Sequence, residues 1–202
     1  MAQPYERGPA RRRQIMQAAL ELLAHDGLGA VTTRNIAGRI GLTEGALFRH
    51  FESKQAILVA SLDHLESQLF EPMQGPPEQD PLVLLERFFR RRVELVSGPT
   101  ALGHLVFSEQ LVHATGEIGR QRIRAWRARS AGFVRTCLDA LAAAGRLRHG
   151  LTADALVSVV QGQVLGFVVE RAIVDPSEPT LETRIDEAWA TLRLLILEPD
   201  GR

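Results

Sequence analysis

The sequence predicts an all-α protein: an N-terminal three-helix head that contains a helix-turn-helix, then a C-terminal helical-bundle body, with about nine helices in all. Three observations support this fold class. Apolar residues recur every three or four positions along most of the chain, and few stretches alternate with the period of two that marks a strand. Aromatic residues make up only 5% of the 202 residues, whereas alanine and leucine, which favour helices, are plentiful.

The head is expected at residues 10–56, after a flexible tail at residues 1–9 that contains two prolines and a glycine. Apolar residues at helical spacing predict its three helices and a compact core. The expected core residues are Leu20, Leu23, Ile36, Ile40, Leu42, Leu47 and Phe51.

Hydroxyl residues mark the expected starts of the next helices, because their side chains accept hydrogen bonds from free N–H groups of the first turn. Thr32 or Thr33 can cap the second helix, Thr43 the third and Ser53 the fourth. Gly41 ends the second helix, so that two short helices are joined by the sequence IGLT. This is the pattern of a helix-turn-helix.

The body is expected at residues 57–202. A long amphipathic helix should start it, because Ile57, Leu58, Leu62, Leu65 and Leu69 share one face, and residues 74–81 should form a loop. The remaining helices are predicted near residues 81–97, 100–114, 117–146, 152–174 and 180–198.

The charge of the chain is unevenly distributed. Residues 1–54 contain eight basic and five acidic side chains, a net charge of +3, and the whole chain has a formal net charge of zero. The remaining residues therefore carry −3. A basic end on an acidic body is typical of a DNA-binding head on a body that does not bind DNA.

Cys137 is the only cysteine, so no intramolecular disulfide can form, which suits a reducing compartment. Residues 1–14 lack the apolar core of a signal peptide. The longest apolar stretch, residues 156–169, is shorter than a membrane-spanning helix requires. We expect a cytoplasmic protein with no membrane partner.

The stretch TEGALFRHFESK, residues 43–54, is unusually polar for so short a helix. A helix-turn-helix places the front of its second helix in the major groove of DNA, which explains this polarity. Leu47 and Phe51 hold the helix to the core. The side chains left to face outward are Thr43, Glu44, Gly45, Phe48 and Arg49.

Two kinds of DNA contact are expected. Lys54 lies in the first turn of a helix, where it can bind a phosphate together with the free N–H groups. Thr33 and His50 are placed for similar backbone contacts. The candidate base contacts are Arg34, Glu44 and Arg49, because arginine favours guanine and glutamate accepts from the cytosine amino group. The alternative is a solvated polar face of an ordinary bundle.

Residues 31–58, VTTRNIAGRIGLTEGALFRHFESKQAIL, resemble the tetracycline-repressor (TetR) family of transcription regulators, and the resemblance runs from about Arg13 to Leu62. Members usually carry tyrosine where this chain has Phe48, which removes one phenol hydroxyl. The resemblance implies DNA-backbone contacts by Thr33, Thr43, Gly45, Phe48, His50 and Lys54. It implies base contacts by Arg34, Glu44 and Arg49.

The resemblance further implies a homodimer and a body that binds a small-molecule inducer, apolar or amphipathic. The protein would then be a repressor that an inducer releases from a pseudo-palindromic double-stranded operator, with no cofactor and no metal. The last two helices are the expected dimer face, because Ile185, Ala188, Trp189, Leu192, Leu195 and Ile196 form one apolar stripe. The alternative is that this stripe belongs to the core of a monomer. Gly162 and Gly166 permit close helix approach.

The inducer pocket is harder to place. Its candidate lining residues are Phe88, Phe89, Phe107, Leu111, Trp126, Phe133, Cys137, Phe167, Gln161 and Gln163, although an aromatic residue on a helix stripe is more often plain core. Glu109, His113 and Glu117 have the spacing of a metal site, but this spacing is common on solvated faces.

Two other function classes remain open at this point. An enzyme is not expected, because no G-x-S-x-G, H-E-x-x-H or phosphate-loop motif is present. A helical module that binds a protein through residues 43–54 is the other alternative.

Overall fold

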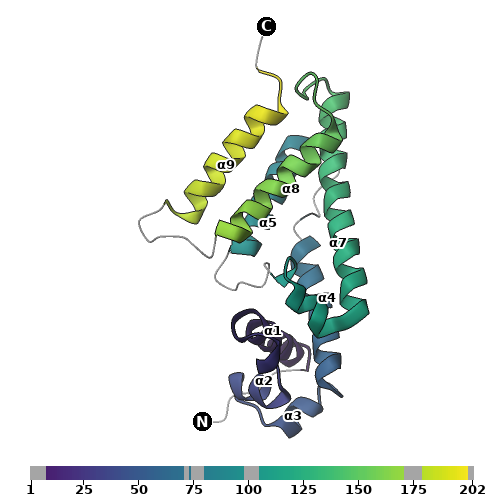
Figure 1. Cartoon of the computed structure of the whole chain (residues 1–202), viewed down its shortest axis with the longest axis vertical. Coiled ribbons are helices and arrows are strands. Elements are labelled where there is room, and N and C mark those ends of the chain that lie inside the picture. The colour runs from purple at the N-terminus through teal and green to yellow at the C-terminus, as the bar shows by residue number, and fades with distance from the viewer. Residues whose placement is uncertain (1–7, 71–72, 74–79, 98–104, 171–178, 200–202) are drawn as a thin grey trace. The chain divides into compact units, whose positions relative to one another are not determined.

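The computed structural model describes residues 8–70, 73, 80–97, 105–170 and 179–199, and most of these residues are helical (Figure 1). Within them the one β-bridge pairs Leu147 with Leu197. The all-α prediction is confirmed. Several predicted segments lie wholly or partly outside the described residues: the tail at 1–7, the loop at 74–79, and the helix portions at 100–104 and 171–174.

The chain divides into two compact units. The head unit consists of residues 1–68 and 100–124, and the body unit of residues 69–99 and 125–202. Two long helices contribute residues to both units: α4, Lys54–Phe70, and α7, Glu109–Ala143. The head unit therefore contains more of the chain than the helix-turn-helix alone.

The head unit begins with α1, Gly8–Asp26, a 3-10 turn at Leu28–Ala30, α2, Thr33–Arg39, and α3, Glu44–Phe48 (Figure 1). The α1 helix starts at Gly8, inside the expected tail, because the missing N–H of Pro9 is not needed in a first helical turn. Ile40 and Leu42 are only partly buried. The fully buried residues include Ile15, Ala19, Leu20, Leu23, Val31, Ile36 and Leu47.

Polar contacts stabilise the other helices of the head unit. The Ser53 hydroxyl accepts from the Ala56 N–H at 3.0 Å, which is the predicted cap of α4. Asp63 on α4 forms an ion pair with Arg122 on α7. Gly116 interrupts α7 with a φ of 64° and a ψ of −144°, so the helix bends where two separate helices were predicted.

The body unit contains α5, Pro81–Ser97, the later part of α7, α8, Ala153–Glu170, and α9, Leu181–Ile196; α5, α8 and α9 contact one another pairwise (Figure 1). Phe89 on α5 is fully buried at their junction. Its ring centroid lies 6.4 Å from that of Phe167 on α8 and 6.0 Å from that of Trp189 on α9. The body core is therefore built by side chains that are distant in sequence.

The α8 helix is long and apolar enough to cross a membrane by length and composition, with a mean hydropathy of 1.3 over its 18 residues. It is longer than the apolar stretch considered above. Core helices pass the same test, and α8 contributes Leu156, Val160, Val164 and Phe167 to the body core. We interpret it as a body helix whose other face is apolar and exposed.

Candidate nucleic-acid interface

The turn between α2 and α3 has the geometry that the sequence predicts. Gly41 has a φ of 67°, a left-handed conformation that favours glycine. The Leu42 N–H returns to the Ala37 carbonyl at 2.8 Å and closes the turn. The Thr43 hydroxyl accepts from the Ala46 N–H at 3.2 Å and caps α3.

The cap of α2 is Thr32, whose hydroxyl accepts from the Asn35 N–H at 3.1 Å. This settles the choice between Thr32 and Thr33. The Thr33 side chain therefore has no capping role and is available for another contact. Each of the two short helices thus begins with its own capping residue, Thr32 for α2 and Thr43 for α3.

The α3 helix is anchored from behind by two apolar side chains and one arginine. Leu47 is fully buried and Phe51 is 4% exposed. The Arg12 guanidinium lies 3.9 Å from the centroid of the Phe51 ring and also donates to the His50 carbonyl. Arg12 thereby connects α1 to the end of α3. Arg12 and His50 are 38 residues apart in the chain, so sequence analysis did not predict this contact.

The side chains on the opposite face of α3 do not pack into the core. Thr43, Gly45, Phe48 and Arg49 are exposed, and Phe48 keeps 48% of its surface accessible. A Cβ added to Gly45 would meet no heavy atom within 4 Å. Neither the packing nor the backbone conformation of the free chain therefore requires glycine here, whereas a closely approaching external backbone would.

Glu44, a predicted base contact, is hydrogen-bonded within the head unit. Its carboxylate accepts from the Thr33 hydroxyl at 2.8 Å and from the Arg34 Nε at 3.4 Å. Three predicted DNA contacts are thus joined in one network, here called the Glu44 network. The arrangement holds the first turns of α2 and α3 together and leaves the Arg34 side chain 87% exposed.

The remaining predicted contacts lie beyond α3. Lys54 is exposed in the first turn of α4, as expected for a phosphate contact at a helix start. His50 is partly buried, and its backbone carbonyl is already used by Arg12. The interface therefore presents basic and polar groups from α2, α3 and the start of α4.

The comparisons with known proteins agree with this geometry. Residues 15–60 match the model of the family described as "Bacterial regulatory proteins, tetR family". The nucleoid occlusion factor SlmA of Marinobacter nauticus is 30% identical over 198 residues, which cover 90% of this chain and 93% of that protein. The chain belongs to the TetR family. The family predicted from residues 31–58 is thereby confirmed, and with it a DNA-binding regulatory protein.

Solved structures share the fold over most of the chain. The ketosteroid transcriptional regulator KstR2 of Mycobacterium tuberculosis has a TM-score of 0.70 at 20% identity, covering 94% of this chain and 96% of that one. AibR in complex with isovaleryl coenzyme A and operator DNA has a TM-score of 0.67 at 20% identity, covering 92% and 97%. The TetR-like fold of the chain is therefore shown.

The body unit of this TetR-family chain has apolar side chains on α8 and α9 that the described residues leave exposed. Val159, Leu165 and Val169 on α8 are 40%, 46% and 62% exposed. Leu194 and Leu195 on α9 are 70% and 42% exposed. Additional Cβ atoms on Gly162 and Gly166 would meet nothing within 4 Å. The stripe predicted for the dimer face is largely wrong, because Ile185, Ala188, Trp189, Leu192 and Ile196 are buried in the body's own core and Leu195 alone of the six is exposed. The rest of the outward apolar surface of α8 and α9 is made by other side chains.

A hollow of about 320 Å³ lies between α8 and α9. Arg184 lies 5.3 Å from the Phe167 ring centroid and forms an ion pair with Glu170 at its edge. The other lining residues are Gln163, Gly166, Glu187, Ala188 and Thr191. The hollow therefore lies between the two helices and is lined mainly by charged and polar residues.

The expected pocket residues do not gather in one place. Phe88, Phe89, Cys137 and Phe167 belong to the body core, with Phe133 packed against it, whereas Phe107 in the head unit is 36% exposed. Burial raises the pKa of the Cys137 thiol to about 11, which keeps it protonated and unreactive at neutral pH.

The carboxylates considered for a metal do not form a cluster. Glu109 and His113 approach to 4.0 Å, both well exposed, but the break at Gly116 interrupts the helix before Glu117. No cluster of three or more metal-ligating His, Cys, Asp or Glu side chains occurs in the described ranges.

Proposed function

We propose that this protein is a dimeric repressor that binds a pseudo-palindromic operator and is released by a small-molecule inducer. The observation that carries the proposal is the division of α3 into two faces. Leu47 and Phe51 anchor one face, and the other is polar, exposed and built around Gly45, which no packing in the free chain requires. A short helix of this kind suits insertion into the major groove.

The residue roles follow from position and chemistry. Thr33, Thr43, Gly45, Phe48, His50 and Lys54 are proposed to contact the DNA backbone, which sets the register of the head. Arg34, Glu44 and Arg49 are proposed to contact bases. Residues 10–56 serve as the DNA-binding domain and residues 57–202 as the ligand-binding and dimerisation domain. We propose no catalytic activity and a cytoplasmic location.

Dimerisation is proposed through α8 and α9. Their exposed apolar side chains and the open sides of Gly162 and Gly166 support close packing against a second copy in a four-helix arrangement. Two heads then read two half-sites about one DNA turn, roughly 34–36 Å, or a multiple apart. Polar substitution of Leu194, the most exposed of these apolar residues, should produce monomers in analytical ultracentrifugation.

The test of DNA recognition is selection of duplexes from a random library with purified full-length protein at two salt concentrations. We expect a site with two-fold symmetry whose affinity falls as salt rises, because phosphate contacts release counterions. Folded protein that enriches no sequence at low salt contradicts the proposal. In that case residues 43–54 would be tested as a protein-binding surface.

Nucleoid occlusion is a second candidate function, because the curated relative that covers 90% of this chain carries that name. The two functions differ in where the protein binds on the chromosome. A repressor should occupy a few sites beside promoters, whereas a factor acting on the nucleoid should occupy many dispersed sites. Mapping bound sites across the genome and measuring transcript changes after deletion separates them.

A further inference from the structure

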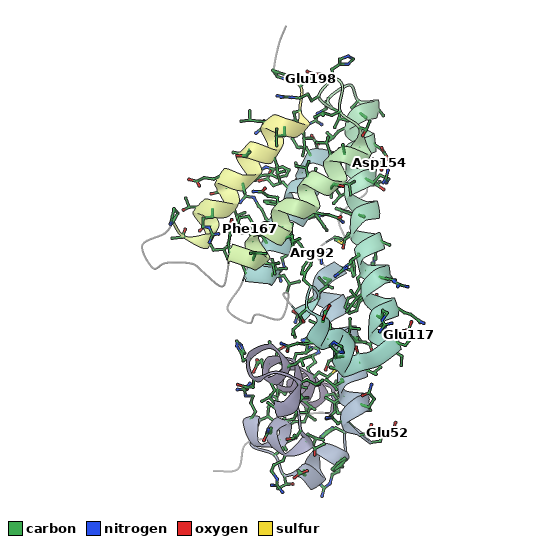
Figure 2. The ribbon with its side chains drawn as sticks, viewed as in Figure 1. Glu52, Arg92, Glu117, Asp154, Phe167 and Glu198 are labelled. Carbon is green, nitrogen blue, oxygen red and sulfur yellow. The ribbon has the colours of Figure 1, made fainter. Side chains whose placement is uncertain are left out.

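Arg92, in the middle of α5, is buried in the body unit and is labelled in Figure 2. It is 8% exposed and is the one charged residue among the buried side chains of the described ranges. Its neighbours in sequence behave differently. Arg90 pairs with Glu86 and Asp186, and the half-exposed Arg91 pairs with Glu94.

The contacts of Arg92 use one of its three nitrogens. Nη2 donates to the Ser130 hydroxyl at 3.1 Å and to the Leu69 carbonyl at 3.4 Å. The guanidinium also lies 5.0 Å from the Phe88 ring centroid and 5.6 Å from that of Phe70. Within the described residues, Nε and Nη1 donate to no partner and no carboxylate pairs with the charge.

An uncompensated buried charge is unfavourable for the fold. Burial lowers the pKa of Arg92 to about 10, and no acidic group of the described residues offsets this effect, yet the group stays charged at neutral pH. Replacing a buried charge by an apolar side chain of similar size is often neutral or stabilising. Capping the end of α4 at Leu69 requires only one N–H donor. Stability therefore does not explain a guanidinium at this position.

We propose that Arg92 binds the carboxylate of an amphipathic ligand whose apolar part packs against the neighbouring aromatic rings. Arginine suits this role because its planar group can donate two parallel hydrogen bonds to a carboxylate. The rings of Phe88 and Phe133, with centroids 5.4 Å apart, supply an apolar surface beside the charge. The inference names the class of the inducer and rests on the proposed function in that respect.

The geometry also connects this ligand to α4. Two parallel donors must include Nη2, because it belongs to both possible pairs of adjacent N–H groups. A carboxylate therefore displaces one existing Nη2 contact, and the longer is the one to Leu69. Leu69 lies in the last turn of α4, the helix that begins at Lys54 of the interface. Ligand binding thus releases a contact at the far end of a helix that contributes to the DNA surface.

The experiment measures ligand binding to full-length protein without DNA. The probes are butanoate, octanoate and dodecanoate, each compared with its uncharged primary amide by titration calorimetry. We expect at least one carboxylate to bind about tenfold or more tightly than its amide, the effect of a charge-assisted hydrogen bond. Equal binding of acid and amide throughout, or no binding of any carboxylate, overturns the proposal.

Three variants locate the effect. Arg92→Met should abolish the preference for carboxylate and leave amide binding unchanged, whereas Arg92→Lys should keep part of the preference. Arg91→Met removes the adjacent, exposed arginine and should keep the full preference. A full preference in Arg92→Met contradicts the assignment. So does a large loss of melting temperature in that variant without ligand, because it would assign Arg92 a structural role.

The binding assay separates this inference from the proposed function, since it contains no DNA. A selected operator with no preference for carboxylates would overturn the ligand assignment alone. Preference for carboxylates without any operator would overturn the repressor alone. If both hold, the tightest carboxylate should release operator DNA from the wild-type protein and from Arg91→Met, but not from Arg92→Met.

Discussion

The head unit and the body unit each contain a short polar network around a charged side chain, and the two networks differ in exposure. Glu44 in the head unit holds Thr33 and Arg34 at the surface, where the Arg34 side chain is 87% exposed. Arg92 in the body unit is 8% exposed and has no charged partner among the described residues. An exposed pair contributes about 0–1 kcal/mol, whereas a buried unpaired charge lowers stability by several kcal/mol. Changing a surface charge therefore has little effect on the stability of the fold. A buried unpaired charge destabilises the fold, so we expect it to serve a function.

The largest effect is expected from the anchor of α3. Leu47→Ala should lower the free energy of unfolding by about 2–5 kcal/mol, because it leaves a cavity under a helix of only five residues. Chemical denaturation followed by circular dichroism measures this change. Phe48→Ala, the adjacent residue that is 48% exposed, should change stability by only about 0.5 kcal/mol. Similar losses in both variants would mean that α3 is not held by one buried face.

The next effect tests the surface charge at the start of α4. Lys54→Ala should weaken binding to every DNA sequence alike and reduce the salt dependence by about one phosphate contact per head. Fluorescence anisotropy on specific and random duplexes across a salt series measures both. Gln55→Ala, the exposed neutral neighbour, is the control. A loss confined to the specific site would instead assign Lys54 to base recognition.

A smaller effect concerns an exposed charge of the body unit, which should behave like those of the head. Asp80 accepts from the Leu82 N–H at 2.8 Å at the start of α5 and pairs with Arg146. The Leu82 N–H, aided by Arg146, holds the pKa of Asp80 below its ordinary value of 3.8. Its stabilising contribution is therefore present above pH 3.8 and lost as the pH falls through the lower, folded-state pKa.

Asp80→Ala should accordingly lower the free energy of unfolding by about 1 kcal/mol at neutral pH, the usual value of a helix cap. The difference from wild type should shrink as the pH falls below 3.8, where Asp80 is protonated first in the unfolded chain and then, at its lower pKa, in the folded one. Thermal unfolding at several pH values measures it. Asp80→Asn, which retains a capping oxygen, should lose much less, and equal losses would contradict the capping role.

The smallest effect concerns Glu44 itself. Its carboxylate accepts from Thr33 and Arg34, so Glu44→Gln should keep an acceptor for only one of these two groups and remove a negative charge that faces DNA phosphates. Affinity for random duplex should rise a few-fold, the range of an exposed pair worth at most about 1 kcal/mol. Discrimination in favour of the operator should fall. Glu52→Gln, exposed in the same stretch, is the control, and a uniform loss of affinity in Glu44→Gln would contradict this role.

The sequence by itself determined the head in considerable detail. The caps at Thr43 and Ser53, the turn at Gly41 and the anchors Leu47 and Phe51 were all predicted and are present. These features depend on hydrogen bonds and side-chain faces within a few residues of one another. Residues close together in the sequence are therefore enough to predict them. The same locality made the family recognisable from residues 31–58.

Only the tertiary structure decided how distant residues meet. Arg12 reaches the His50 carbonyl across 38 residues, and Glu44 binds Thr33 across 11. Arg92 looks in sequence like its neighbours, the partly buried Arg90 and the exposed Arg91, and its burial follows from packing against α4 and α7. Burial sets the energy of a charge, and it depends on the whole surrounding core. The sequence could therefore identify a DNA-binding head, whereas the side chain proposed to recognise the ligand emerged only from the packed body.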